Sequence, residues 1–574
     1  MRFFNLFSSA KLVALSASTL AIYATLFAAT ASANKEPSAA EFAEQFFDDE
    51  ERLFLEDKKS SVAPAAANAV VFETSQEKPV RRQWYSAGGW STLHQGPGNR
   101  DQARGARLHE SYTTWQALEG ISLMIAPSVS PGKTRFYQTT GQGKGKSNLY
   151  ALSMEGEILW QSKPWTDASN GVDPCAVLSN VIVDVNGDLY LGDCNQMFAF
   201  DPDGNPKWVV PLPAPQEGDW QPLADLPINA LTTPVFTVDG HILGVTNFGD
   251  VVVWDRANGE VLNQPIRLPG MLSPRSDAVP QPKSMWANGM LDESIHDWSW
   301  QLLFGGEMRS MNTPAVSQAT GRVFVAATST EPSLGRLYGL DLIPTPNGIV
   351  IEIAFATDFG IGSGSSPATS NDDRFVYVSD EEGYVYSIDA QSGSIVWKAK
   401  TNATAGSAVV DMDGTVIVLQ AYPNPNMMAL DGDTGDVKWL SSSAELAAET
   451  LPSTWLLGDP VAAANGIPTV TEDAIVVPVA YGYKFWVGRT IVVPVENHVV
   501  AFDKETGKAF RNVVRISDDS SNTTPVLSNG IIMSPMGAAM SSGLTPLAKI
   551  TRWFFPDGIE QVQTIGGLQV AIPD

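Results

Sequence analysis

The stretch that decides the fold is Ala429–Trp439, which reads ALDGDTGDVKW. It begins as an apolar strand, passes through Asp431 into a short polar turn that ends at Gly435, and continues as a second strand carrying Trp439. Glycine supplies the positive φ that tight hairpins need, and aspartate hydrogen-bonds back to the turn backbone. The stretch therefore predicts two antiparallel strands joined by a tight turn.

Copies of this unit recur along the chain. They are Ser387–Trp397 (SIDAQSGSIVW), Ala199–Trp208 (AFDPDGNPKW), Tyr150–Trp160 (YALSMEGEILW), Ala501–Gly507 (AFDKETG), Val253–Gly259 (VWDRANG) and a weaker copy, Leu337–Asp341 (LYGLD). The clearest repeat positions are Asp389, Gly393, Trp397, Asp431, Gly435, Trp439, Asp503 and Gly507. Self-similarity of this kind is the signature of a repeat architecture.

A second feature precedes the copies: a Pro or small residue, an apolar pair and a polar turn. It occurs eight times, as APSVSPG from Ala126, PCAVLSN from Pro174, TPVFTVDG from Thr233, TPAVSQATG from Thr313, SPATSNDD from Ser366, SAVVDMDG from Ser407, IPTVTED from Ile467 and TPVLSNG from Thr524. Each unit then holds four short antiparallel strands, A to D, with Trp on strand D placed to pack against the next sheet. One such blade cannot bury both faces, so we expect an all-β, eight-bladed β-propeller over residues 81–574.

Closure of the ring is predicted from a segment near 109–118. Tyr112–Leu118 (YTTWQAL) is similar to a D strand that lacks its own A, B and C strands. We expect it to pair into the last blade and so join the two ends of the repeat region.

The string ALDGDTGDVKW resembles the quinoprotein repeat, whose pattern is A-x-D-x-x-T-G-x-x-x-W, and Ser387–Trp397 and Ala501–Gly507 are near matches. The resemblance covers roughly Ala126–Asp574 as an architecture. It is shared by the eight-bladed propellers of pyrroloquinoline quinone (PQQ) dehydrogenases and by outer-membrane assembly scaffold lipoproteins. One fold hosts enzymes and scaffolds alike, so the resemblance implies a fold and leaves the function open.

The chain departs from both groups. Family dehydrogenases usually carry two adjacent cysteines over the cofactor, whereas Cys175 and Cys194 stand nineteen positions apart. Trp90–Asn99 (WSTLHQGPGN) lies where the family has an N-terminal signature, without a clear match. No catalytic carboxylate or calcium ligand carries over by motif. The scaffolds are usually shorter and lipid-anchored, and this chain lacks the lipid-bearing cysteine.

Charge excludes one class of partner. The 63 acidic and 37 basic residues give a formal charge of −26, which repels phosphate backbones and anionic lipid headgroups. We therefore expect no nucleic-acid partner.

The N-terminus is typical of an export signal over residues 1–33. Arg2 and Lys11 precede or flank an apolar run from Leu12 to about Ala29, and Ala31–Ala33 has the form of a cleavage site. An uncleaved anchor is the alternative; after cleavage we expect no membrane span and a periplasmic or secreted location. Residues 34–80 form an acidic, Ala-rich leader and linker, whose Glu41–Asp57 stretch has the apolar spacing of a short amphipathic helix.

Propeller topology places the D-to-A and B-to-C connections on one face, which carries the longest insertions: Pro211–Ala230, Pro269–Asn312, Leu440–Ala464 and Gly482–Asn497. A binding site is expected there, because function concentrates on loops held by a rigid scaffold. Cys175 is predicted at the start of an A strand and Cys194 in the B–C turn of the same blade. Both lie near this face, which favours a disulfide in an oxidising compartment; free thiols are the alternative.

The most chemically suggestive stretch is Ser294–Trp300 (SIHDWSW) on this face. His296 beside Asp297 is a candidate oriented imidazole for proton transfer, and Trp298 and Trp300 are candidates for stacking on a ligand ring. The competing interpretation is a loop anchored by aromatic packing, because sequence neighbours in a strand point to opposite faces.

Metal motifs are weak. Asp184, Asn186 and Asp188 are similar to the start of a calcium loop, but the later bidentate Glu is missing, so an A–B hairpin turn is predicted instead. The histidines show no metal-ligand spacing, and no metal site is predicted; they are His94, His109, His241, His296 and His498.

Three functions remain from sequence. The first is a non-catalytic envelope protein whose loop face binds an envelope protein or a small-molecule ligand. The second is a dehydrogenase that uses PQQ with calcium to oxidise an alcohol-type substrate. The third, a hydrolase or lyase on the same ring, has no motif behind it. No catalytic or cofactor-binding residue is assigned, and no cofactor is assured.

Overall fold

Short runs of alternating apolar residues, each ended by a turn containing Gly or Asp, form the strands of this protein. The computed structural model describes residues 84–574 apart from 88, 168–170, 222–225, 271–289, 297, 300–311, 332–333, 363–364, 402–405, 421–425, 442, 465, 487–489, 519, 521–522 and 538–564. They fall in the unit Val80–Asp574; the predicted signal and leader in Met1–Pro79 lie outside the described residues.

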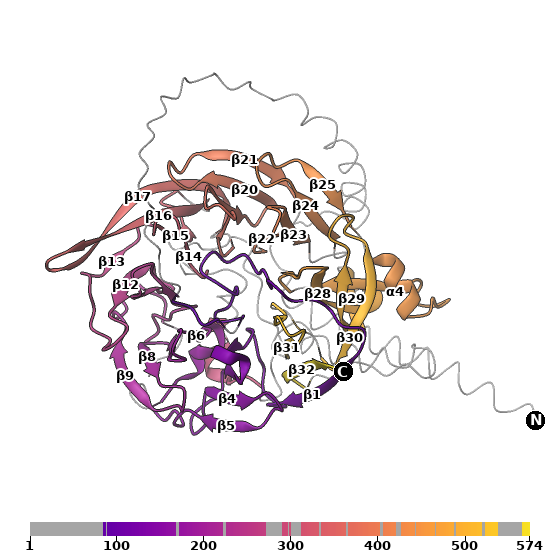
Figure 1. Ribbon diagram of the computed structural model, residues 1–574, viewed down its shortest axis with the longest axis horizontal. Helices are drawn as coiled ribbons and strands as arrows, with labels where there is room; N and C mark the ends of the chain where they lie inside the picture. The colour runs from indigo at the N-terminus through magenta and orange to yellow at the C-terminus, as the bar shows by residue number, and fades with distance from the viewer. Residues whose placement is uncertain are drawn as a thin grey trace, which may run out of the picture. The chain divides into compact units, whose positions relative to one another are not determined.

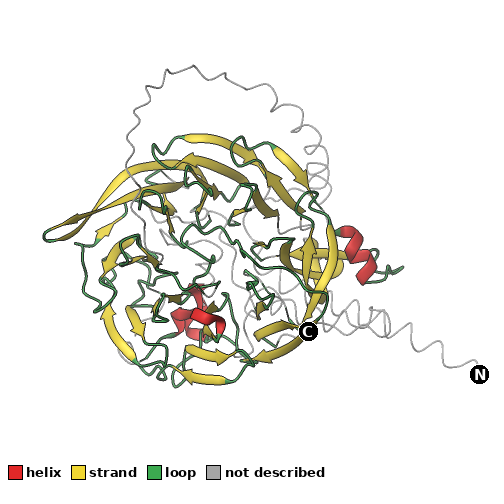
Figure 2. Cartoon of the chain, viewed as in Figure 1, coloured by secondary structure: helices red, strands yellow, loops and turns green. Residues whose placement is uncertain are grey.

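The strands form eight small antiparallel sheets arranged around one axis (Figures 1 and 2). The first four blades are β2–β5 (Ser128–Val129, Arg135–Thr139, Leu149–Ser153, Ile158–Gln161), β6–β9 (Ile182–Val183, Leu189–Gly192, Gln196–Phe200, Pro206–Pro211), β10–β13 (Val235–Phe236, Ile242–Val245, Asp250–Trp254, Ile266–Arg267) and β14–β17 (Ala315–Val316, Val323–Thr328, Leu334–Thr345, Gly348–Ile361).

The remaining blades follow the same order. They are β18–β21 (Ala368–Thr369, Phe375–Ser379, Tyr384–Asp389, Ile395–Lys400), β22–β25 (Val409–Val410, Val416–Gln420, Asn426–Leu430, Val437–Leu440), β27–β30 (Thr469–Val470, Ile475–Trp486, Thr490–Phe502, Ala509–Ile516) with the extra strand β26 (Val461–Ala464), and β31, β32 and β1 (Ile532–Met536, Gly567–Pro573, Tyr112–Ala117). The predicted all-β, eight-bladed propeller is therefore confirmed.

The last blade takes strands from both ends of the repeat region. β1 pairs antiparallel with β32 along its whole length, from Tyr112 opposite Pro573 to Ala117 opposite Leu568. Val526 forms an isolated bridge to Ile532 and supplies the inner edge of this blade. The pairing expected of Tyr112–Leu118 is thus present, and it closes the ring.

The Trp of the repeat joins neighbouring blades. Trp397 on β21 donates through Nε1 to the carbonyl of Gly432 in the next blade (3.0 Å), and its ring lies against Gly435. The same bond to the next blade's turn is made by Trp160 to Pro202, Trp208 to Arg256 and Trp439 to Lys504. The repeated Trp therefore packs against the next sheet, as predicted.

The repeated Asp shapes the turn between strands C and D. Asp431 Oδ1 accepts hydrogen bonds from the backbone N–H groups of Asp433 and Thr434, both at 3.0 Å. Asp389 and Asp503 make the equivalent bonds in their own blades. Asp184 likewise accepts from Asn186 and Asp188 in an A–B turn, which is the hairpin turn expected there.

Helices are few among the described residues. The 3-10 helices are η2 (Pro131–Lys133), η3 (Pro174–Leu178) and η4 (Glu293–Ile295), and α4 (Ala444–Thr450) lies in the connection between the sixth and seventh blades. No helix in this part of the chain is both long and apolar enough to cross a bilayer.

Two local predictions were wrong. The second start, PCAVLSN, is the helix η3 and not strand A, because Asp173 caps it and Pro174 opens it; strand A of that blade is β6. Gly482–Asn497 does not interrupt its hairpin, because β28 and β29 pair through most of it, from Ile475 opposite Phe502 to Trp486 opposite Thr490, with one bulge between Tyr481 and Gly482.

Candidate functional site

The two faces of the ring differ at the axis. We call the side of the A–B and C–D turns the turn face, and the side of the D–A and B–C connections the loop face. The segment Trp84–Leu108, here named the axial strap, crosses the centre of the ring (Figure 1). It packs against the ends of the A strands that lead into the A–B turns, which places it on the turn side of the axis.

The axial strap is bonded to every blade. Its backbone carbonyls accept from the second residue of six inner strands: Trp90 from Val129, Ser91 from Val183, Pro97 from Val316, Gly98 from Thr369, Arg100 from Val410 and Asp101 from Val470. Tyr85 Oη accepts from Phe236 N in the third blade, and Thr523 Oγ1 of the eighth donates to Leu93 O. The strap therefore acts as a common edge for the inner strands and closes the axis on the turn face.

Buried polar side chains fix the strap. Asn99 donates through Nδ2 to three carbonyls, those of Thr313, Pro314 and Pro367, at 3.0–3.1 Å. His94 Nδ1 lies 2.9 Å from Asp101 Oδ2, and both side chains are fully buried. Burial raises the pKa of Asp101, while the adjacent His94 acts in the opposite direction.

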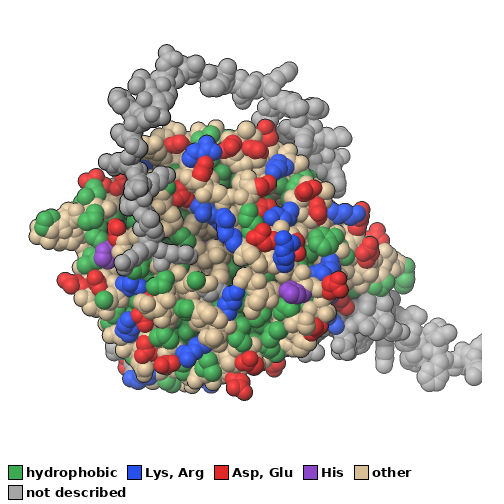
Figure 3. Space-filling model, viewed as in Figure 1, with side chains coloured by type: hydrophobic (Ala, Val, Ile, Leu, Met, Phe, Trp, Pro, Cys, Tyr) green, Lys and Arg blue, Asp and Glu red, His purple; other side chains and the backbone are tan. Residues whose placement is uncertain are grey.

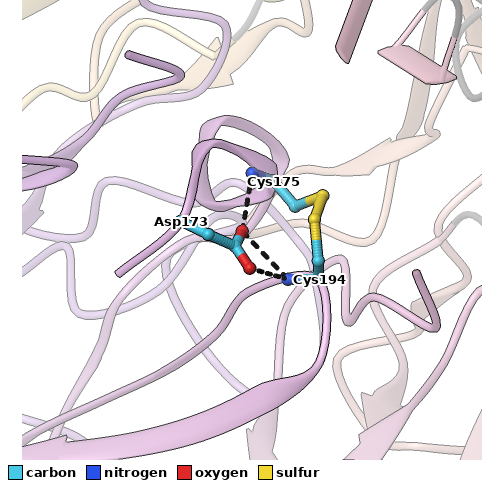
Figure 4. A group of neighbouring side chains, drawn as sticks. All are labelled: Asp173, Cys175 and Cys194. Carbon is cyan, nitrogen blue, oxygen red and sulfur yellow. Dashed lines mark hydrogen bonds between the residues drawn. A yellow bond between two sulfur atoms is a disulfide. The ribbon is translucent and has the colours of Figure 1, made fainter. Parts of the chain in front are cut away.

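On the loop face, Cys175 and Cys194 form the predicted disulfide, with Cα atoms 5.1 Å apart. Cys175 lies in η3, in the D–A connection, and Cys194 in the B–C turn between β7 and β8. Asp173 points between them (Figure 4): its carboxylate accepts from Cys175 N at 2.9 Å and from Cys194 N at 3.1 Å. The prediction that Cys175 begins an A strand was wrong, for the reason given for η3.

A second buried carboxyl, Asp193, lies beside Asp173 and accepts from its backbone N–H at 3.2 Å. Burial raises the pKa of Asp193 to about 6. Burial, and then the neighbouring Asp193, raise the pKa of Asp173 well above its usual range. Asp173, Cys175 and Cys194 have ligand-type atoms within 4.8 Å of one another, but sulfurs joined in a disulfide are not thiolates and do not bind a metal as such.

The structure brings part of the SIHDWSW stretch onto this disulfide. Trp298 is buried in one apolar cluster with Cys175, Cys194, Trp165 and Met124. His296 is half-buried, and its Nε2 lies 3.2 Å from the carbonyl of Leu291. Asp297 and Trp300 lie outside the described residues. The described contacts favour aromatic anchoring, since Trp298 is part of a core and does not face solvent.

One pocket on the turn face had no signal in the repeat pattern. It has a volume of about 250 Å³ and lies between the fifth and sixth blades, where turns that are distant in sequence meet. Its cations are already paired: Arg374 binds Asp372 and Asp433, and Lys438 binds Asp413. The charged side chains that line the pocket are thus engaged in these ion pairs or, for Asp431, in hydrogen bonds to its own turn.

The residues around the disulfide do not fit a bound PQQ with calcium. PQQ is a quinone with three carboxylates, and such an anion requires cationic partners. The described titratable groups next to the disulfide are two carboxyls, Asp173 and Asp193, whose bonds go to backbone N–H groups and to each other. The described cation Lys144 is held by an aromatic ring: its Nζ lies 5.7 Å from the centroid of Trp165, which belongs to the apolar cluster of the disulfide. Ca²⁺ takes carboxylate oxygens as ligands, but those of Asp173 and Asp193 already accept hydrogen bonds from backbone N–H groups, and neither carboxyl offers a cation to PQQ.

Comparison with known proteins agrees with the architecture. Residues 314–478 match the family model PQQ_2, described as outer membrane protein assembly factor BamB. No curated protein matches the chain in sequence. The matched residues run from the fourth to the seventh blade, and the eight-bladed architecture agrees with the match.

Solved structures share the fold. A europium-containing methanol dehydrogenase is 12% identical with a TM-score of 0.50, covering 84% of this chain and 98% of its own. The quinohemoprotein alcohol dehydrogenase ADHIIG from Pseudomonas putida HK5 is 11% identical with a TM-score of 0.50, covering 85% and 80%. BamB from Moraxella catarrhalis is 12% identical with a TM-score of 0.45, covering 80% and 99%. The likeness to the two dehydrogenases is a likeness of fold, and the family match covers residues 314–478 of this chain.

Proposed function

We propose that this chain is an exported binding scaffold of the cell envelope, and that its loop face binds another envelope protein or a small-molecule ligand. The observation that carries the proposal is the asymmetry of the axis. The axial strap bonds to all eight blades and closes the turn face, while the disulfide, the buried carboxyl pair and the described parts of the long connections lie on the other side.

Surface charge supports a protein or small-ligand partner. The face seen in Figure 3 carries Asp, Glu, Lys and Arg side chains mixed together, without a field of one sign. A mixed surface suits a protein interface, in which polar groups pair around an apolar centre. The export signal predicted over residues 1–33 would bring the ring to the envelope, and cell fractionation tests that location.

The loop-face proposal is tested by site-specific photo-crosslinking in intact cells. A crosslinking amino acid replaces Gln216, which is exposed in the connection between the second and third blades. The matched control replaces Gln391, which is equally exposed in a C–D turn on the other face. Discrete adducts from position 216 and none from 391 are expected. Adducts from 391 alone, or equal adducts from both positions, would place binding elsewhere and sink the proposal.

The second candidate, a PQQ- and calcium-dependent alcohol dehydrogenase, is favoured only by the fold shared with such enzymes. Its test is a titration of the purified chain with PQQ in the presence of Ca²⁺, followed by thermal melting and absorbance. We expect no shift at saturating PQQ, because Asp173 and Asp193, the buried carboxyls beside the disulfide, offer no cation to the carboxylates of PQQ. A bound quinone spectrum with a raised melting temperature would replace the scaffold proposal with the enzyme.

A further inference from the structure

We propose that the apolar cup beside the disulfide is a groove for an amphipathic helix, which the chain fills with its own residues 290–299, and that the loop-face partner docks such a helix there. This inference rests on the proposed function and names the chemistry of the partner. The cup is defined here by Met124, Trp165, Leu178, Leu226, Ile228 and the disulfide, and residues 290–299, of which 297 is not described, are called the resident segment.

The resident segment binds to blades far from its own place in the chain. It belongs to the connection between the third and fourth blades, yet Asp292 N donates to Gly141 O in the first blade at 2.9 Å. Met290 O accepts from Ser122 N and from Gln142 Nε2, both at 2.9 Å. It therefore lies across the loop face as a docked segment.

Its apolar residues have helical spacing. Leu291, Ile295 and Trp298 stand at positions i, i+4 and i+7, and all three are buried in the cup. Asp292 caps η4 by accepting from Ser294 N at 3.0 Å, and Glu293 and Ser294 are exposed. Anchors at i, i+4 and i+7 are how an amphipathic helix is read by a hydrophobic groove.

The groove is shaped for close approach of a backbone. A side chain at Gly141 would meet Leu291 at 2.4 Å, and one at Gly143 would meet the Asp292 carboxylate at 1.9 Å. The Gly-rich turn Gly141–Gly145 thus serves as a wall against which a helical turn can lie.

The resident segment fits the groove imperfectly. Among the described residues, no hydrogen-bond partner lies by the buried indole Nε1 of Trp298, the hydroxyl of Ser299 or, in the cup, Nε1 of Trp165. Each such group loses its hydrogen bonds to water without replacement, which costs about 1–3 kcal/mol. A partner helix that brings an acceptor to these donors would bind the cup more favourably than the resident segment does.

The test uses a labelled peptide with the sequence of residues 290–300, MLDESIHDWSW, added to the purified full chain. The chain carries Leu291→Ala and Trp298→Ala, which weaken the grip of the resident segment. We expect the peptide to bind this variant about tenfold more tightly than the wild type. A control peptide with alanine at the positions of Leu291, Ile295 and Trp298 should bind neither protein.

A second variant keeps the test decisive if the double variant loses cooperative unfolding. Asp292→Ala removes the cap of η4 and leaves every apolar contact of the cup in place. It should also bind the peptide more tightly than the wild type. Absence of peptide binding to both variants overturns the groove. If crosslinks from position 216 still form in that case, loop-face binding stands and only the helix groove fails.

Discussion

The Trp-to-turn contact explains the residue pattern of the repeat. The Trp397 indole donates to Gly432 O and covers Gly435. The Trp of one blade therefore packs on the Asp–Gly turn of the next blade, and the repeated residues meet at one contact between blades. Gly435 has φ +76°, and a Cβ there would lie 2.7 Å from the Trp397 ring. The positive φ and the ring contact both require glycine at this position. The requirement could be predicted from sequence because Gly and Trp recur at the same spacing in the repeat.

Replacing Gly435 by Ala should lower the free energy of unfolding by about 2–4 kcal/mol, since backbone strain and overpacking add. The matched control is Gly414→Ala in the same blade, where φ is +92° and no atom lies within 4 Å of the added Cβ. This control variant adds backbone strain without overpacking, and it should lower the free energy of unfolding by about 1–2 kcal/mol. Denaturant unfolding followed by tryptophan fluorescence measures both. Equal losses would show that the ring contact with Trp397 contributes nothing.

His498 gives the chain an acid-sensitive position. It is largely buried in β29 with Nε2 2.9 Å from Glu496 Oε2. Burial lowers the pKa of His498 below 6.5, although Glu496 acts in the opposite direction. The unfolded chain therefore takes up this proton more readily than the folded chain. The stability that the neutral ring contributes is present above pH 6.5 and is lost as pH falls through the folded pKa.

His498→Gln should remove this part of the pH dependence, which amounts to about 1.4 kcal/mol per unit of pKa difference between the folded and unfolded states. Unfolding midpoints of wild type and variant, measured at about pH 7.5 and about pH 5.5, give the difference. A variant slope identical to that of the wild type would contradict the assignment to His498.

At the scale of the element, a bulge accompanies each clear copy of the repeat. In the sixth blade Ala429 pairs with Trp439 and Leu430 with Val437, so Lys438 is an extra residue on strand D. The same shift leaves Leu159 and Val396 extra in their blades, and both are exposed by more than two-fifths. A bulge re-aims the neighbouring side chain, which is how each Trp reaches the next blade.

The features that could be predicted from sequence are those set by residues close together in the chain. The hairpins, the count of blades and the pairing of Tyr112–Leu118 depend on turn chemistry and alternation, which act over a few residues. The helix η3 could not be predicted from the local pattern, because PCAVLSN has the same residue pattern as the other strand starts. It forms a helix because Asp173 caps it. The meeting of Trp298 with the disulfide depends on packing between blades that are far apart in sequence.

The disulfide should stabilise the second blade by limiting the unfolded chain. Cys175→Ala with Cys194→Ala removes a link across 19 positions and should lower the free energy of unfolding by about 2–4 kcal/mol. Both sulfurs are fully buried, so the folded wild type should resist a mild reductant. Denaturant unfolding of the variant and of the wild type, with and without reductant, is the measurement. Equal stability of variant and oxidised wild type would assign the link no structural role.

At the scale of the whole molecule, two devices hold the ring. Pairing of β1 with β32 joins its ends, and the axial strap bonds to the inner strand region of each blade. The strap was not predicted because it has no apolar period. Gln95, Asn99 and Asp101 take positive φ, and the bonds are mostly backbone to backbone across hundreds of positions. Repeats alone contact only their neighbours, so the strap adds coupling between blades that do not touch.

This coupling can be tested at Asn99, whose amide serves carbonyls in the connections that lead into the fourth and fifth blades. Asn99→Gly keeps the backbone at φ +52° without strain and leaves three buried carbonyls without their donor. The free energy of unfolding should fall by about 3 kcal/mol. Asn205→Ala, which removes one exposed bond within a single turn, is the control and should cost less than about 1 kcal/mol.

Because the strap touches every blade, the loss at Asn99 should move one transition for the whole ring. Tryptophan fluorescence and far-ultraviolet circular dichroism should then give coincident unfolding curves for wild type and variant, both displaced by the same amount. Separate transitions in the variant, with one of them at the wild-type midpoint, would mean that the blades near Asn99 unfold independently. In that case the strap would be a passive filling of the axis, and closure by β1 and β32 alone would hold the ring.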